Sequence, residues 1–220
     1  MRIVVSYINK LDEIPRPRFI KGDKMQEQQE NETAEDKVEL AGQWSDHFEI
    51  STKKESLRAK VVLSVCYLDE VLDQLLKIVL KPSDSKNDLL FNGPQAPLGT
   101  FSSKIEMTYR MGLISKEIKD SLNYIRKIRN EFAHNLLESD FSNPKILGLN
   151  RNLYKLNNSA MRERRKIFSE GEIGNFEAVV SLMIFLIRII IQDIPVTCPC
   201  CGDKMTYRER IKHLSPTENQ

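Results

Sequence analysis

The sequence predicts an all-α protein, a single helical bundle of about six helices with a flexible N-terminal extension and a short cysteine-rich C-terminal tail. Glycine and proline are scarce, with nine of each in 220 residues, and residues 34 to 194 are rich in helix formers. Apolar residues there recur at helical spacing. The polar tract "KGDKMQEQQENET" cannot bury enough apolar surface to offset its ordering entropy. We therefore expect an extension over 1–33, a helical domain over 34–195 and a tail over 196–220.

Two helices are predicted at the start of the domain. Thr33 precedes "AEDK", which places an N-cap before acidic residues in a first turn, and this helix extends to about residue 50. The second covers about 54–80 and ends before Pro82. Its apolar residues fall within one stripe at 100° per residue, namely Val61, Val65, Leu68, Leu72, Leu75, Leu76 and Val79.

The third and fourth helices have recognisable ends. "NDLLFNGPQAPLG" is a loop by its glycine and proline content. Thr100 is the expected N-cap of a short helix that reaches Met111 and ends at Gly112. Ser115 then caps the fourth helix.

The last two helices differ in character. We expect a loop over "ESDFSNPKILGLN", a basic helix over about 158–169, and an apolar helix over about 175–193. The apolar run 178–191 is about four residues short of a membrane span and contains Arg188. It predicts a central core helix, with a homodimer interface as the alternative.

Composition narrows the class of protein. Thirty-three lysines and arginines against 31 acidic residues leave a net charge of +2, so no global field attracts nucleic acid or a membrane. "MRIVVSYINK" lacks the pattern of a secretory signal, and four cysteines of which three cluster in "CPCCG" do not form a disulfide framework. These features predict a cytoplasmic protein.

An arginine lies on the apolar face of the fourth helix. On an ideal wheel that starts at Ile118, Arg129 projects to about 20°, inside the apolar stripe, and His134 to about 160°. A buried guanidinium needs a partner, and Asp69, on the shoulder of the second helix's stripe, is the expected one. Asn130, at about 120°, shares the outer face with His134.

Three segments of the chain carry a family resemblance. They read "SLRAKVVLSVCYLDEVLDQLLKIVL", "APLGTFSSKIEMTYRMGLIS" and "LNYIRKIRNEFAH", and span residues 56 to 134 in order. Together they resemble the mannitol operon repressor family of small helical proteins. The stretch "RNEFAH" also fits the R-x4-H pattern of HEPN domains, many of which are metal-independent ribonucleases that act as dimers. The long N-terminal extension and the "CPCCG" tail depart from the repressor pattern.

The resemblance implies two functions. One is a transcriptional regulator of carbohydrate uptake that acts through protein partners, without a DNA-binding domain of its own. The other is an endoribonuclease in which His134 takes the 2′-OH proton and Arg129 stabilises the phosphate, with Asn130 beside them. On one ideal helix Arg129 and His134 lie about 140° apart, so catalysis needs a distorted helix end or a second copy of the chain. A homodimer is expected in either case.

Two further clusters carry binding hypotheses. Basic residues in "MRERRKIF" form a candidate phosphate-contacting patch for RNA or DNA, with an ordinary solvated helix face as the alternative; they are Arg162, Arg164, Arg165 and Lys166. Cys198 and Cys201 have the C-x2-C spacing of a zinc knuckle. The remaining two zinc ligands are Cys200 with His213, or a second tail in a dimer; free thiols in a flexible tail are the alternative.

Overall fold

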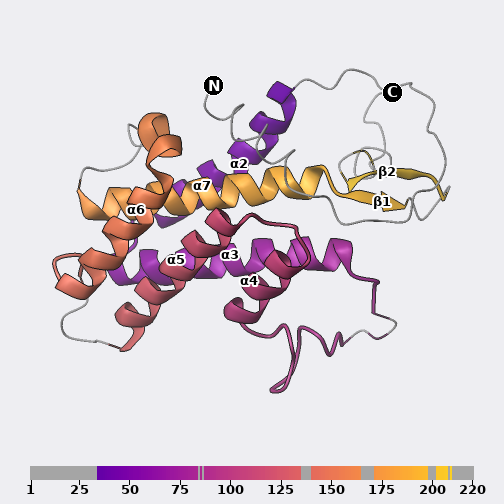
Figure 1. The fold of residues 1–220 in the computed structure, drawn as a ribbon, viewed down its shortest axis with the longest axis horizontal. Helices are drawn as coiled ribbons and strands as arrows, with labels where there is room; N and C mark the ends of the chain where they lie inside the picture. The colour runs from indigo at the N-terminus through magenta and orange to yellow at the C-terminus, as the bar shows by residue number, and fades with distance from the viewer. Residues whose placement is uncertain are drawn as a thin grey trace.

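The computed structural model describes residues 34–83, 85, 87–134, 140–164, 171–197, 202–207 and 209. Within them the chain forms six helices and two short strands (Figure 1), which confirms the all-α prediction. The helices are α2 (Ala34–Thr52), α3 (Leu57–Val79), α4 (Phe101–Arg110), α5 (Lys116–His134), α6 (Pro144–Arg164) and α7 (Glu172–Gln192). The strands are β1 (Pro195–Thr197) and β2 (Lys204–Thr206). The predicted extension over 1–33 lies outside the described residues.

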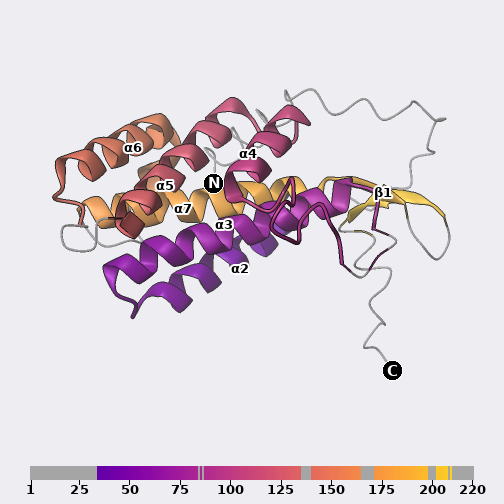
Figure 2. The ribbon, with the colours of Figure 1, turned by 90° about the horizontal axis from the view of Figure 1, so that it is seen from below.

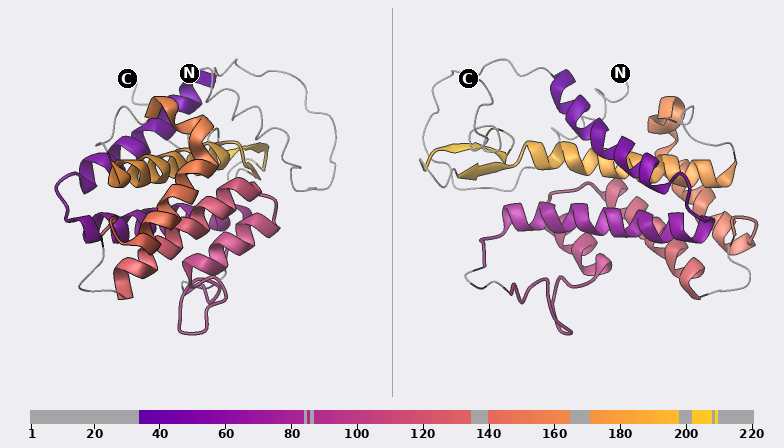
Figure 3. Two further views of the ribbon diagram at one scale, coloured as in Figure 1. Left: turned by 60° about the vertical axis from the view of Figure 1, so that its left-hand side comes forward. Right: turned by 180° about the vertical axis from the view of Figure 1, so that it is seen from behind.

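Helix α7 is the centre of the bundle. It packs against α2, α3, α5 and α6, and Figures 1 and 2 show it running the length of the molecule between them. Seen from the side and from behind, α2 and α3 lie along α7 (Figure 3). By length and composition α7 could cross a membrane, but most of it is buried by its neighbours, as in the core helix of a soluble protein. The prediction of a central core helix is confirmed.

Polar contacts on α7 set the directions of its neighbours. Nζ of Lys60 lies 2.8 Å from Glu177, and Nη1 of Arg188 donates to Oε1 of Gln74 at 2.7 Å, so α3 runs parallel to α7. Oγ of Ser45 donates to the carbonyl of Ser181 at 3.1 Å. Since these contacts are spaced along α7, they fix the register of the helices that cover it.

Two helix starts follow the predicted capping chemistry, whereas Thr33, the N-cap predicted for the first helix, lies outside the described residues. Oγ1 of Thr100 accepts from the backbone N–H of Ser103 at 3.1 Å, and Oγ of Ser103 accepts from the N–H of Thr100 at 3.3 Å, which completes a capping box. Oγ of Ser115 accepts from the N–H of Ile118 at the start of α5. Gly112 has a φ of 71°, a conformation that glycine adopts at low cost after a helix end.

The prediction for α6 was wrong at its start. The helix begins at Pro144 and not near residue 158, so most of the expected loop is helical. Asn143 is the N-cap: its Oδ1 accepts from the backbone N–H of Lys145 at 3.0 Å, and its carbonyl accepts from Leu147. Proline is favoured at the first helical position, because its missing N–H would have no intrahelical partner there.

The buried stripe of α6 explains why hydrophobic periodicity missed it. The residues buried at helical spacing are Ile146, Asn150, Leu153 and Asn157. Two of the four are amides, and each is held by hydrogen bonds. Asn150 donates to Glu172 at the start of α7, and Asn157 donates to Ser121 on α5 at 3.0 Å.

A small hairpin follows α7. Strands β1 and β2 pair antiparallel with Pro195 opposite Thr206 and Thr197 opposite Lys204. The backbone N–H of Tyr207 donates to Ile194 and continues the pairing. These strands were not predicted from the sequence, and along the chain they lie on either side of the segment that holds Cys198 and Cys201.

We expect Asn143→Ala to destabilise the protein by about 1 kcal/mol, because two N–H groups at the start of α6 lose their acceptor. Asn143→Ser, which retains a capping oxygen, should stay close to wild type. Chemical denaturation followed by circular dichroism measures both. Equal stability of Asn143→Ala and wild type would contradict a helix start at Pro144.

Candidate functional site

The R-x4-H residues lie at the C-terminal end of α5. Arg129 is half-buried, and its Nη1 donates to Oδ1 of Asn130 at 3.3 Å. Nε of Arg129 is buried and has no hydrogen-bond partner within the described residues. His134 is exposed and is the last residue of the helix.

The helix end does not bring Arg129 and His134 together. α5 stays α-helical through His134, so the two side chains leave the helix about 140° apart. The buried side of α5 also includes Ser121 and Ile128, which centres the stripe away from Arg129. Arg129 is therefore at the edge of the core, where a long side chain can bury its stem and keep its charged end near the surface.

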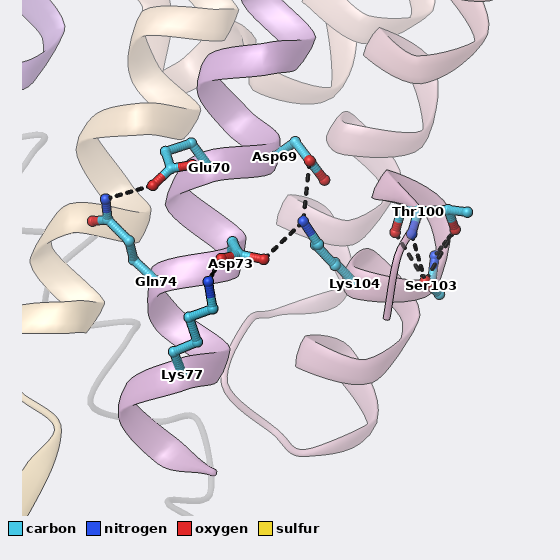
Figure 4. Close-up of polar contacts among 8 residues, drawn as sticks. All are labelled: Asp69, Glu70, Asp73, Gln74, Lys77, Thr100, Ser103 and Lys104. Carbon is cyan, nitrogen blue, oxygen red and sulfur yellow. Dashed lines mark hydrogen bonds and ion pairs between the residues drawn. The ribbon is translucent and has the colours of Figure 1, made fainter. Parts of the chain in front are cut away.

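The structure does not form the expected ion pair between Asp69 and Arg129, because Asp69 pairs with a different cation. Oδ2 of Asp69 accepts from Nζ of Lys104 at 3.1 Å (Figure 4). Helical wheels of the second and fourth helices leave out α4, which packs on α3 and supplies Lys104. A cation on a third helix therefore pairs with Oδ2 of Asp69, while its buried Oδ1 has no partner among the described residues.

Lys104 joins two carboxylates of α3 in a partly buried cluster. Its Nζ lies 2.9 Å from Oδ1 of Asp73, whose Oδ2 lies 2.5 Å from Lys77 (Figure 4). Burial by itself would lower the pKa of Lys104, but hydrogen bonds to Asp73 and Asp69 outweigh it and raise that pKa. Burial by itself would raise the pKa of Asp73, but hydrogen bonds from Lys77 and Lys104 outweigh it and lower that pKa. The cluster therefore holds its charges at neutral pH and ties α4 to α3.

Arg188 is a second buried cation. The sequence places it on an apolar helix but does not indicate its partners. The guanidinium of Arg188 lies 3.6 Å from the ring centroid of Trp44, in addition to its hydrogen bond to Gln74. Gln74 in turn donates to Glu70 at 3.0 Å (Figure 4). Burial lowers the pKa of Arg188 to about 10, against the opposing effects of Glu70 and Tyr207, so it remains a cation at neutral pH. These contacts use Arg188 to join α2, α3 and α7.

An open groove, which was not predicted from the sequence, lies between α5 and α6. Its volume is about 840 Å³. Basic and amide side chains from both helices line it, together with Tyr124, Asp120 and Leu156; they are Asn123, Arg126, Lys127, Asn152 and Lys155. Asn123 and Lys127 are on the same side of α5 as Asn130 and His134, because all four project between about 120° and 180° on the helix. The helical spacing of these residues along the polar face of α5 could have predicted the α5 side of the groove.

The two other predicted clusters fall largely outside the described residues. Arg165 and Lys166 lie outside them, and of Arg162 and Arg164 only the helical backbone of α6 is described. Cys198 and Cys201 also lie outside them. The described neighbours are the last residue pair of the hairpin, Thr197 with Lys204, and Gly202, whose φ is 80°.

Comparison of the chain with models of protein families, with curated proteins and with solved structures finds no match.

We expect Asp73→Asn to lower the free energy of unfolding by about 2 kcal/mol at pH 7, because Lys104 loses the closer of its two carboxylate partners and keeps Asp69. A carboxylate whose pKa is lower in the folded state stabilises the fold above its ordinary pKa of about 4, and this stabilisation is lost as the pH falls through the folded value. The difference from wild type should therefore shrink below about pH 4.

Urea denaturation at pH 7, 4 and 3 measures this difference. Asp46→Asn, at an exposed position, is the matched control and should stay near wild type throughout. A difference for Asp73→Asn that is as large at pH 3 as at pH 7 would show that the carboxylate charge is not what stabilises the cluster.

Proposed function

We propose that this chain is a cytoplasmic regulatory protein of the mannitol operon repressor type, which acts on carbohydrate uptake by binding a protein partner. The first of the three segments that carry the resemblance corresponds to α3. The second corresponds to α4 and the loop before it, and the third to most of α5. These three helices contact one another. The Lys104 cluster joins α3 to α4, and an ion pair of 2.7 Å between Lys119 and Glu106 joins α5 to α4. The resemblance thus coincides with one packed unit.

The observation that favours regulation is the separation of Arg129 from His134 on an undistorted helix. Cleavage of RNA without a metal requires a base at the 2′-OH and a cation at the phosphate, both within hydrogen-bond reach of one reacting centre. One copy of the chain does not offer this pair. A regulator needs no such convergence, because it binds its partner without a reaction at one centre, and Arg129 can then be a structural arginine.

The alternative is a metal-independent endoribonuclease that uses Arg129, Asn130 and His134 across a homodimer. Two observations support keeping it: Nε of Arg129 is buried without a partner among the described residues, and His134 is exposed. A second copy of α5 packed against the first would bring one copy's His134 toward the other's Arg129. The homodimer is part of both proposals.

We expect no RNA turnover by wild type above that of His134→Ala, because a regulator has no use for the histidine as a base. The assay follows fragmentation of a labelled RNA at neutral pH without divalent metal, with Lys53→Ala as an exposed control. Turnover by wild type and Lys53→Ala that is lost in His134→Ala would establish the ribonuclease instead. Sedimentation at micromolar concentration should give a dimer, and a monomer would contradict the homodimer.

We also propose that Cys198 and Cys201 bind zinc. The observation behind this is the hairpin, whose register pairs Thr197 with Lys204 and so brings together the two ends of the segment that holds both cysteines. A zinc knuckle places its two thiolates in such a turn, and the positive φ of Gly202 fits the glycine that follows the second cysteine. Two thiolates fill half of a tetrahedral site, so a second tail, or Cys200 with His213, supplies the rest.

Protein purified without chelator should contain about one zinc per two chains if two tails share the ion. Cys198→Ser should lose the metal and shift the sedimentation of the dimer. Elemental analysis and sedimentation measure the two effects, with Cys66→Ser as the control because Cys66 lies on α3. Metal-free wild type with unchanged sedimentation of Cys198→Ser would overturn the proposal.

A further inference from the structure

The groove between α5 and α6 has fixed walls. The two helices run antiparallel, with Asn157 bonded to Ser121 near one end and Lys145 paired to Glu131 at 2.7 Å near the other. Asn157 and Ser121 are both buried. The groove residues on α5 and α6, apart from Asp120 next to the first tie, lie between these two ties along the chain. Their backbones are therefore held in place before any ligand arrives, which reduces the entropy lost on binding.

The groove is electropositive. Arg126, Lys127 and Lys155 form no ion pair with any residue that the structure describes. Nε of Arg126 is moreover buried without a hydrogen-bond partner there. The acidic lining residue, Asp120, is already paired with Lys116 at 2.5 Å. Three cations from two helices thus face the groove, against one carboxylate among the described lining residues, which already has a cationic partner.

Two asparagines in the groove, Asn123 and Asn152, can form hydrogen bonds with hydroxyl groups of a ligand. The amide nitrogen of Asn123 donates to the carbonyl of Lys119 at 3.1 Å, which leaves its Oδ1 as an acceptor. Asn152 offers a second amide from the opposite wall. The ammonium of Lys127 lies 5.5 Å from the ring centroid of Tyr124, a contact that restrains this long side chain at the groove.

We infer that this groove binds a phosphate ester that also carries hydroxyl groups, with Arg126, Lys127 and Lys155 on the phosphate and the two asparagines on the hydroxyls. Guanidinium and ammonium groups form the charge-assisted hydrogen bonds that phosphate oxygens require. A volume of about 840 Å³ suits a small molecule such as a sugar phosphate. The same chemistry occurs along an RNA strand, and Lys127 lies two helical turns from His134 on the same side of α5. The inference goes beyond the proposed function, because it assigns a ligand whether the chain is a regulator or a ribonuclease.

Titration calorimetry on the full chain with ribose 5-phosphate, inorganic phosphate and a short oligouridylate tests the inference. We expect ribose 5-phosphate to bind more tightly than inorganic phosphate, and Lys127→Ala with Lys155→Ala to weaken it at least about 10-fold. Lys53→Ala with Lys54→Ala removes the same charge at exposed positions outside the groove and should change binding less than about 2-fold. Circular dichroism checks that each pair folds, and Lys127→Gln with Lys155→Gln replaces the first pair if it does not.

The outcomes separate the two sources of phosphate. Selective loss of ribose 5-phosphate binding supports a small ligand. Oligouridylate binding that is lost in the groove variant, with ribose 5-phosphate at least about 100-fold weaker, supports an RNA strand. No binding of either probe, or equal loss in both double variants, overturns the inference. Inorganic phosphate binding as tightly as ribose 5-phosphate overturns the part assigned to the asparagines. None of these results depends on RNA turnover or on dimerisation.

Discussion

The structure depends on covering α7 on all sides while satisfying the few polar groups that it carries. Its apolar residues are buried almost throughout, so no single neighbour can protect it from water. An apolar helix alone would accept its neighbours in many registers, because the hydrophobic effect has no direction. Glu177, Ser181 and Arg188 remove that freedom, since each would be an unsatisfied buried group if its partner helix slid along α7. Burial thus holds the bundle together, and three polar positions determine how it is assembled.

The sequence predicts a helix correctly where its capping residues and apolar spacing match the burial of that helix in the bundle. The stripe of α3, the caps at Thr100 and Ser115, and the apolar sequence of α7 all indicate the element that forms. α6 fails this test because Asn150 and Asn157 occupy buried positions, so a search for apolar periodicity finds only half of its stripe. The information was present at the helix start, where Asn143 and Pro144 form a capping sequence. The hairpin escaped prediction because three-residue strands carry too little pattern.

The candidate site shows a different limit. A helical wheel assigned Arg129, Asn130 and His134 to their sides of α5, but it could not say which helix would cover each side. Asp69 pairs with Lys104 because α4 packs against α3. That packing depends on the arrangement of the whole bundle, and a comparison of two helices cannot reveal it. The groove was not predicted for the same reason, since its two walls come from α5 and α6, and the second wall lies between the expected loop and the expected basic helix, where no element was predicted.

The contact between Arg188 and Trp44 gives the molecule a built-in optical probe. The chain has one tryptophan, and 40% of its surface is exposed while its ring lies against the guanidinium. Indole emission responds both to a nearby positive charge and to the polarity of the surrounding solvent. Because Trp44 belongs to α2 and Arg188 to α7, all of the protein's tryptophan fluorescence arises from one interface between its first and last described helices. Undocking of α2 would therefore change the colour and intensity of that emission without any added label, even while the remaining helices stay packed.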